Sequence, residues 1–360
     1  MANRAAIILS GGRAERFQNA QEIWQDKALV VLHGKPLLVH AVENVNDVVD
    51  EVVVCVNNEK RKAHYLEVLK KHNIKNAKLL VDEKRNNMGG PIVGILTGLF
   101  AVKADYCFTL PSDMPFFQPN VIDYMFESLK DSRVLVPMWP NGRLETLTMV
   151  TKKPDVLEIA KTLYTLKRPR SDDIMRGALN VVLMSIADEL MVLDPKLKSF
   201  ININSQADFV KLQPRQGQGP FVESVRLTFG DLPLPELLRL QKASELLSDD
   251  NLLEASKVLF SCSTQLETEG SYFWAAVSRE TEGKCLLRLS EQQGCSEFAQ
   301  QYLVDCKEAL LKAVKNYELE AKLYDHYHSI FLAERARSNM NWCKSFVRGK
   351  LCKIEGSASR

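Results

Sequence analysis

The first 209 residues alternate short apolar runs with amphipathic stretches, and this alternation constrains the fold more than any other feature of the chain. The apolar runs are rich in Val, Ile and Leu, which is typical of strands covered on both faces. Strands are expected at 5–9, 51–56, 78–81, 106–110, 134–137, 147–150 and 200–203. Helices are expected between them, at 36–44, 59–72, 92–101, 120–130 and 153–161. This order predicts a three-layer α/β/α Rossmann-like domain with a mostly parallel sheet, which binds ligands beyond the carboxyl ends of its strands.

The remaining residues follow a different pattern. The segment QPRQGQGP at 213–220 is rich in Pro, Gly and Gln and has no periodicity, so we expect a linker over 213–235. Beyond it only helical patterns occur, at 235–247, 252–266, 272–289, 296–314 and 321–348. The sequence therefore predicts an α/β domain over 1–212 and an all-α domain over 236–360. The helices are expected to form hairpins similar to tetratricopeptide repeats or a plain antiparallel bundle.

Composition and charge argue against several classes of protein. The net charge of +2 gives no reason to expect nucleic-acid binding, and no apolar run reaches the length of a membrane span. Met1 leads into a polar pair rather than a signal peptide, so a cytoplasmic location is expected. The eight cysteines include no C-x-x-C pair, which favours buried thiols over a zinc site or a disulfide framework. His326 and His328 do not share a helix face, so a surface or core role is favoured over metal binding.

The run AAIILSGGRAERF places Gly11 and Gly12 directly after the first expected strand. Glycines at such a point let main-chain N–H groups approach a phosphate or a base closely, and Arg13 and Arg16 add positive charge for a polyphosphate. Lys27 opens the next apolar run and is placed to reach back over the same site. A tight strand-to-helix turn is the alternative interpretation, because the segment matches neither the dinucleotide fingerprint nor the P-loop.

Three further segments favour the same chemistry. In LPSDMPFF, Asp113 follows a strand, where a carboxylate can hold Mg²⁺ against phosphates or merely cap a turn. In MGGPIVGI, Gly90 precedes a helix whose N-terminus can face an anion or a base, or simply begin the helix. In ININ, Asn202 and Asn204 alternate with buried isoleucines, so both amides are expected to project together, and Asn204 also suits a helix cap.

Taken together, these segments resemble the molybdenum cofactor guanylyltransferases, which are nucleotidyltransferases of the glycosyltransferase-A type. The resemblance covers about residues 4–212, in the family's order. It rests on L-S-G-G-R-A-E-R-F with Lys27, G-K-P-L-L at 34–38, G-G-P-I-V-G at 89–94, P-S-D-M-P at 111–115 and I-N-I-N-S-Q-A-D-F at 201–209. It implies a Rossmann-like nucleotidyltransferase domain that transfers GMP from GTP to the terminal phosphate of molybdopterin, using Mg²⁺ and releasing pyrophosphate.

The resemblance also implies a role for individual residues. The nucleotide-binding set would be Leu9, Ser10, Gly11, Gly12, Arg13, Lys27, Asn57, Asp82 and Gly90. Within it, main-chain groups of residues 9–12 would line the guanine and ribose pocket, and Asn57 and Asp82 would read the guanine edge. Lys27, Arg16 and Asp113 would be catalytic, with Asp113 as the magnesium ligand. Asn202 and Asn204 would bind the acceptor, while Glu145 matches a recurring acidic position without an assigned role.

The chain departs from the family pattern in three places, and alternatives stay open. Phe17 stands where the family has Met-Gly, the loop before Lys27 is longer, and the helical part has no counterpart in the minimal enzymes. The alternative enzymes are nucleotidyltransferases of the same fold that use CTP with molybdopterin, or a cobinamide-phosphate or sugar-phosphate acceptor. A non-catalytic nucleotide-binding scaffold is the alternative from another class. The C-terminal helices leave open a molybdoenzyme or a pathway protein as partner, or self-association.

Overall fold

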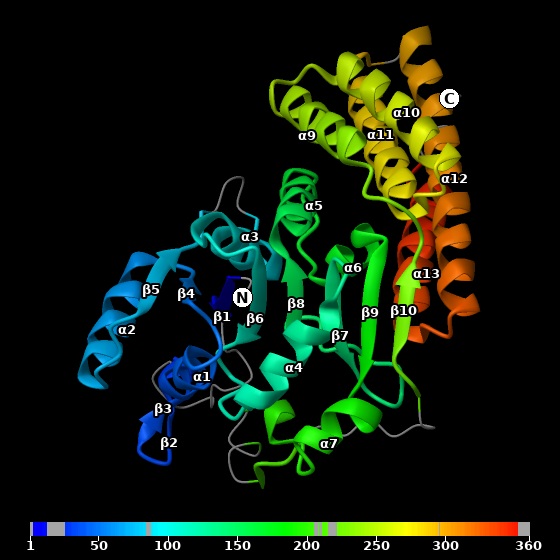
Figure 1. Ribbon diagram of the computed structural model, residues 1–360. Coiled ribbons are helices and arrows are strands. Elements are labelled where there is room, and N and C mark those ends of the chain that lie inside the picture. The colour runs from blue at the N-terminus through cyan, green and yellow to red at the C-terminus, as the bar shows by residue number, and fades with distance from the viewer. Residues whose placement is uncertain are drawn as a thin grey trace. The chain divides into compact units, whose positions relative to one another are not determined.

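The computed structural model describes residues 3–12, 26–83, 88–204, 208, 211–214, 222–294 and 296–351 (Figure 1). These residues form two compact units. The first comprises Met1–Ala160 and Pro169–Leu227, and the second comprises Lys161–Arg168 and Thr228–Arg360. The chain first passes between the units within helix α5 (Lys153–Thr165), whose last residues are grouped with the helical unit, and it does so again after Arg168 and after Leu227.

The first unit contains an eight-stranded sheet in the order β10-β9-β7-β8-β6-β1-β4-β5 (Figure 1). The strands are β1 (Arg4–Ser10), β4 (Glu51–Val56), β5 (Ala77–Val81), β6 (Tyr106–Pro111), β7 (Val134–Met138), β8 (Met149–Lys152), β9 (Asn180–Ser185) and β10 (Val225–Thr228). Strand β1 pairs in parallel with β4 and β6, β4 with β5, and β7 with β9, whereas β8 runs antiparallel to both of its neighbours. The predicted mostly parallel α/β class is confirmed.

Both faces of the sheet are covered, as the apolar strands required. Side chains alternate along β1, so Ala6 and Ile8 join the core under α1 (Leu37–Asn46), α2 (Glu59–Lys71) and α4 (Pro119–Leu129). The intervening Ile7 faces α3 (Pro91–Ala101), where Gly98 lies against it. The remaining helices of this unit are α6 (Asp172–Ala178) and α7 (Met191–Leu193).

Local sequence explains where the helices beside the strand ends begin. Helix α2 starts after Asn58, whose side chain accepts a hydrogen bond from the main chain of Arg61, and Lys70 and Lys71 lie in its last turn. Helix α3 starts with Pro91. Proline suits a first helical position because an N–H at that position would have no partner within the helix. Both helices therefore have their N-termini at the edge of the sheet where β4 and β5 end.

Several predicted elements were wrong. Residues 200–203 form no strand, because Lys198–Phe200 is a 3₁₀ turn and 201–204 pair with no strand of the sheet. The strand expected at 147–150 begins two residues later, since Thr148 closes a turn onto Glu145. Strands β9 and β10 were not predicted, and β10 lies in the stretch expected to be a linker. A short hairpin, β2 (Val31–Leu32) with β3 (Lys35–Pro36), was also missed.

The second unit is helical, as predicted. Its helices are α9 (Leu234–Ser248), α10 (Leu252–Thr268), α11 (Tyr272–Gln292), α12 (Glu297–His326) and α13 (Ile330–Phe346), and each packs against the next along the chain. The break expected between 314 and 321 does not exist, because α12 runs through it for 30 residues. Asn316, Tyr317 and Glu320 are buried there, so continuing the helix keeps their contacts with neighbouring helices.

The described residues include six of the eight cysteines. Cys55, Cys107, Cys262, Cys285, Cys306 and Cys343 are buried free thiols, as expected, while Cys295 and Cys352 lie outside those residues. Within the same residues, each helix is too short or too polar to cross a bilayer. His326 and His328 are both exposed.

Candidate active site

Several of the predicted site residues follow neighbouring parallel strands, β1, β4, β5 and β6, which end at one edge of the sheet (Figure 1). Gly11 and Gly12 follow β1, Asn57 follows β4 and Asp82 follows β5. Asp113 follows β6 by two residues, and the register of β1 with β6 places Leu9 beside Pro111. The main chain of Ser112 continues this contact by donating to the Leu9 carbonyl at 3.0 Å. The topology therefore brings together segments that are up to a hundred residues apart.

A cavity of about 380 Å³ opens at this edge. Its lining comprises Leu9, Ser10, Gly11, Gly12, Cys55, Asn57, Asp82, Met88, Gly89, Gly90, Pro91, Val93, Gly94 and Leu147. Seven of the predicted nucleotide-binding residues, namely Leu9 to Gly12, Asn57, Asp82 and Gly90, are among them. Main chain and apolar side chains form most of this lining, and Asp82 contributes a carboxylate. Such a lining suits a flat ring with a few polar edge groups.

Glycine is required at one point around this cavity and allows a close approach at another. A Cβ at Gly11 would lie 3.2 Å from Asp82 Oδ2, so that carboxylate would have to shift by a few tenths of an ångström, and the Gly11 carbonyl accepts a hydrogen bond of 3.2 Å from Asn57 Nδ2. Gly90 has φ of 102°, and a Cβ there would lie 2.8 Å from Pro169. Gly12 differs, because a Cβ there would meet no atom of the described residues within 4 Å.

A second group of predicted residues gathers around Lys27. The Lys27 ammonium contacts both Asp113 Oδ2 and Asn204 Oδ1. Asn204 Nδ2 in turn donates to Asn202 Oδ1 at 2.6 Å. Ile201 and Ile203 are buried, so the two amides project together as the alternation in ININ predicted. The Ile203 main chain donates to the Asp113 carbonyl at 2.9 Å, which holds the asparagines next to the acid.

Asp113 has one oxygen without a hydrogen-bond donor. Its Oδ2 pairs with Lys27, whereas its Oδ1 is buried and accepts no hydrogen bond from any residue that the structure describes. A buried carboxylate oxygen normally has a partner, and oxygen is the ligand that Mg²⁺ prefers. In the described parts of the chain, no set of three His, Cys, Asp or Glu side chains is arranged to hold a metal. Asp113 is absent from the cavity lining, so it lies beside the cavity rather than in its wall.

The remaining predicted residues are either outside the described parts of the chain or away from the cavity lining. Arg13 and Arg16 lie outside the described residues. Glu145 accepts hydrogen bonds from the Trp139 indole at 2.6 Å and from Arg143 at 3.0 Å, which gives it a structural role in the turn before β8. Residues 205–207 are likewise not described, while the Asn204 main chain donates to Asp208 at 2.9 Å.

Cys55 lines the cavity but does not provide a nucleophile. Burial, followed by the charge of Asp82, raises the pKa of its thiol far above the ordinary value. The thiol therefore stays protonated at neutral pH and behaves as a small apolar group.

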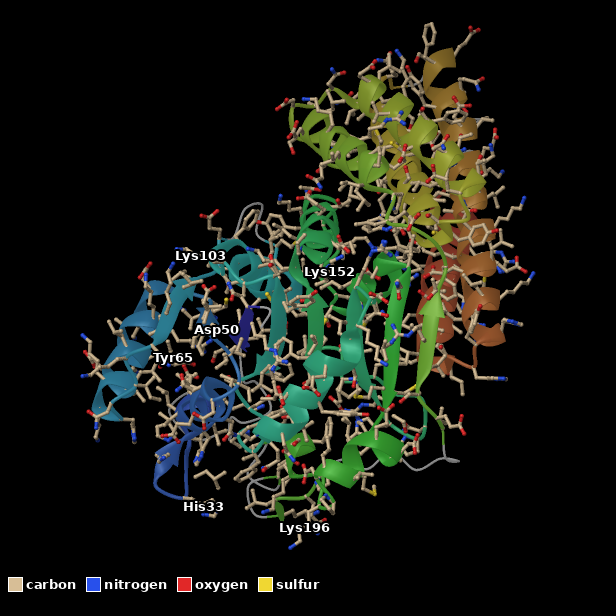
Figure 2. The ribbon with its side chains drawn as sticks, viewed as in Figure 1. His33, Asp50, Tyr65, Lys103, Lys152 and Lys196 are labelled. Atoms are coloured by element: carbon tan, nitrogen blue, oxygen red, sulfur yellow. The ribbon has the colours of Figure 1, made fainter. Side chains whose placement is uncertain are left out.

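Sequence reasoning missed three residues that contact this edge, namely Asp26, Arg61 and Tyr65. Arg61 and Tyr65 stand four residues apart on α2 and are buried, although the rest of that helix is mostly polar. Figure 2 labels Tyr65, which lies on the side of α2 that meets the sheet. The only signal in the sequence was the spacing of Arg61, Tyr65 and Leu69, which puts them on one helix face.

Known proteins of similar sequence match the α/β part of this chain. Residues 6–177 match the model of the MobA-like NTP transferase domain. A probable molybdenum cofactor guanylyltransferase from Methanosarcina acetivorans is 31% identical over 207 residues, which are 57% of this chain and 88% of that protein. Its counterpart from Methanosarcina mazei is 30% identical over 205 residues, again 57% and 88%.

Molybdopterin-guanine dinucleotide biosynthesis protein A from Archaeoglobus fulgidus aligns over 58% of this chain and 96% of its own, at 23% identity and a TM-score of 0.47. The segment 6–177 contains the cavity, Lys27 and Asp113, whereas Asn202, Asn204 and the helices from α9 onward lie beyond it. On the sequence match and the identity to these relatives, the chain belongs to the MobA-like nucleotidyltransferase family of enzymes.

Proposed function

We propose that this enzyme transfers GMP from GTP to the terminal phosphate of molybdopterin and releases pyrophosphate. The observation that carries the proposal is the pairing of two features at one sheet edge: a glycine-lined cavity with Asp82 in its wall, and the Lys27–Asp113–Asn204 cluster beside it. The names of the two Methanosarcina relatives support the choice of guanine nucleotide and of molybdenum cofactor.

The carboxylate of Asp82 in the wall of the cavity favours guanine. Guanine presents two adjacent donors on one edge, the ring N–H and the exocyclic amine, and an ionised carboxylate is purely an acceptor. Asp82 lies against Gly11, so a base resting on the glycine main chain would bring that edge to the carboxylate. Among the described residues nothing lies within 4 Å of a Cβ at Gly12, so a purine can rest on the main chain there without meeting any of them.

Asp113 and Lys27 suit the triphosphate end of the nucleotide. Asp113 Oδ1 would hold Mg²⁺, with substrate phosphates and water as the other ligands, as is usual for this ion. When bound, the ion would neutralise charge on the phosphates during the displacement. Lys27 is held by Asp113 and Asn204, so its ammonium is placed at the same point to bind phosphate oxygens. Positioning and charge compensation are what such a transfer requires of the protein.

The acceptor phosphate needs no general base, and Asn202 and Asn204 are suited to bind it. The attacking phosphate oxygen is already ionised at neutral pH, so no general base is required. Asn202 and Asn204 would bind the acceptor, offering amide groups on the other side of Lys27. Their link through Lys27 to Asp113 would align the acceptor with the nucleotide.

The test is a reconstituted reaction. Purified protein is incubated with Mg-GTP and molybdopterin, and pyrophosphate and the guanine dinucleotide product are measured by coupled assay and mass spectrometry. Parallel reactions replace GTP with CTP, replace molybdopterin with a sugar phosphate, or add EDTA. We expect product only in the reaction that contains both GTP and molybdopterin, and we expect EDTA to abolish it. Higher kcat/KM with CTP, or turnover only with a sugar phosphate, would contradict the proposal.

A further inference from the structure

Helix α2 carries two polar residues that are buried, although most residues of the helix are exposed. Arg61 is 7% exposed and Tyr65 is fully buried, within the otherwise charged segment EKRKAHYLEVLKK. A buried guanidinium and a buried phenol need hydrogen-bond partners, because removing them from water without partners is costly. Both find partners on the loops at the carboxyl edge of the sheet, beside the cavity.

Arg61 joins the end of β1 to the residue that precedes Lys27. One guanidinium nitrogen donates to the Ser10 carbonyl at 3.0 Å and to the Gly12 carbonyl at 3.3 Å. Its Nε forms an ion pair with Asp26 Oδ2 at 2.7 Å. Asp26 also caps the 3₁₀ turn Lys27–Leu29 by accepting from the main chain of Ala28. Arg61 thus contacts two segments at the same time: the glycine loop, which is Ser10–Gly12, and Asp26, which we call the anchor of Lys27.

Tyr65 adds a second connection between the same segments. Its hydroxyl lies 3.0 Å from Asp26 Oδ1 and 2.9 Å from Ser10 Oγ, and Ser112 Oγ lies 3.0 Å from Ser10 Oγ. The Tyr65 hydroxyl donates to Asp26, which uses its single proton. Ser10 must then donate to Tyr65, and Ser112 to Ser10. Burial, followed by the charge of Asp26, raises the pKa of Tyr65, which keeps that proton in place.

These contacts determine how the glycine loop is presented to a ligand. A peptide unit is planar and trans, so holding the Ser10 carbonyl against Arg61 turns the Gly11 N–H to the opposite side. The Gly11 carbonyl is held separately by Asn57. The Ser10 hydroxyl has already given its proton to Tyr65, so Ser10 offers a ligand its main chain but no hydroxyl donor. The loop is therefore oriented before any nucleotide arrives, which lowers the cost of binding.

We propose that Arg61, Tyr65 and Asp26 are positioning residues for nucleotide binding, acting through the Ser10–Gly12 main chain and through the anchor of Lys27. This inference rests on the proposed nucleotidyl transfer. A merely structural role would lower thermal stability without selecting one substrate. A positioning role predicts weaker nucleotide binding with little change in the KM of the acceptor.

The first test is Tyr65→Phe, which removes only the hydroxyl. We expect the Kd for Mg-GTP, measured by calorimetry, to rise by roughly 5–30-fold, as for the loss of a buried hydrogen-bond link. The acceptor KM should stay within about twofold. The matched control is Tyr124→Phe on α4, whose hydroxyl donates to Glu189 at 2.6 Å away from the cavity, and we expect its Kd to equal that of wild type. An unchanged Kd for Tyr65→Phe, or an equal loss in the control, would overturn the inference.

The second test compares Arg61→Lys with Arg61→Ala. Lysine can pair with Asp26 but lacks the planar fork that also reaches two carbonyls, so its nucleotide Kd should fall between those of wild type and Arg61→Ala. Each protein is titrated with GTP, ATP, CTP and UTP. If wild type prefers CTP, the proposed base is wrong, and the positioning role is judged on CTP instead. If wild type binds none of the four, both proposals fail; if it binds and the variants match it, the positioning role alone fails.

Discussion

Two aspartates at the same sheet edge have different surroundings and are expected to act differently. Asp82 lies in the cavity wall against Gly11, whereas Asp113 pairs with Lys27 and keeps one buried oxygen without a donor. The proposed function assigns recognition of the base to Asp82 and compensation of phosphate charge to Asp113. Changing each aspartate should therefore give a different kinetic result.

Asp113→Asn is expected to lower turnover by at least ~10²-fold, because it removes the charge that would hold Mg²⁺ and orient Lys27. Steady-state rates over a magnesium titration would measure the loss. Asp131→Asn, an exposed carboxylate at the end of α4, is the control and should match wild type. Turnover of Asp113→Asn within a few-fold of wild type would contradict the assigned role.

Asp82→Asn is expected to weaken discrimination between GTP and ITP, the analogue that lacks the exocyclic amine. Wild type should bind GTP more tightly by roughly 10-fold, because a charged acceptor strengthens each hydrogen bond to the base edge. In the variant that ratio should fall to about threefold or less. Calorimetric titration with both nucleotides measures it, and an unchanged ratio would place the base elsewhere.

At the scale of elements, α3 approaches the central strand unusually closely. A Cβ at Gly98 would lie 2.4 Å from Ile7 Cγ2, and one at Gly94 would lie 3.0 Å from Leu9. The motif G-G-P-I-V-G-I-L-T-G thus serves both the cavity and the packing of a helix on β1. Sequence reasoning assigned only the first role, because the close approach depends on the position of β1.

Gly98→Ala is therefore expected to destabilise the first unit, although alanine favours helices. Overpacking against the buried Ile7 costs about 1–3 kcal/mol, and the helix propensity of alanine recovers up to ~1 kcal/mol. Urea unfolding should show a net loss of the free energy of unfolding. Gly89→Ala is the control, because its Cβ would meet no atom within 4 Å in the part of the chain that the structure describes. A variant as stable as wild type would show that α3 can shift at no cost.

At the scale of the whole molecule, each unit keeps its own core, and the helical one is built around a buried charge. Glu280 on α11 accepts from Tyr317 at 2.6 Å and pairs with Arg168 at 3.3 Å and with Lys284. Arg168 comes from Lys161–Arg168, the short segment that interrupts the first unit in sequence. Burial opposes ionisation of Glu280, but Arg168, Lys284 and these hydrogen bonds lower its pKa to about 2.

This pKa predicts how the helical unit responds to acid. The pKa in the folded protein lies below the ordinary value of 4.5, so ionised Glu280 stabilises the fold above about pH 4.5. That contribution, of order 3 kcal/mol, is lost as the pH falls toward about 2. Hydrogen exchange of α11 and α12 between pH 5 and 2.5 should show the loss, with β1 and β4 as the internal control. Glu280→Gln should flatten the dependence, and an equally steep profile in that variant would contradict the assignment.

The sequence by itself predicted the α/β class, the helical second unit, and a shared edge for the glycines and Asp113, while the family resemblance implied Asn57 and Asp82 at the same edge. It could do so because periodicity and strand-end chemistry are local, and parallel strands deliver their ends to one edge. Only the tertiary structure decided that Arg61 and Tyr65 turn toward Ser10 and Asp26, that β10 joins the sheet, and that α12 continues unbroken. Each of these depends on partners far away in the chain, and local pattern carries no information about which partner a buried polar group or an edge strand will find.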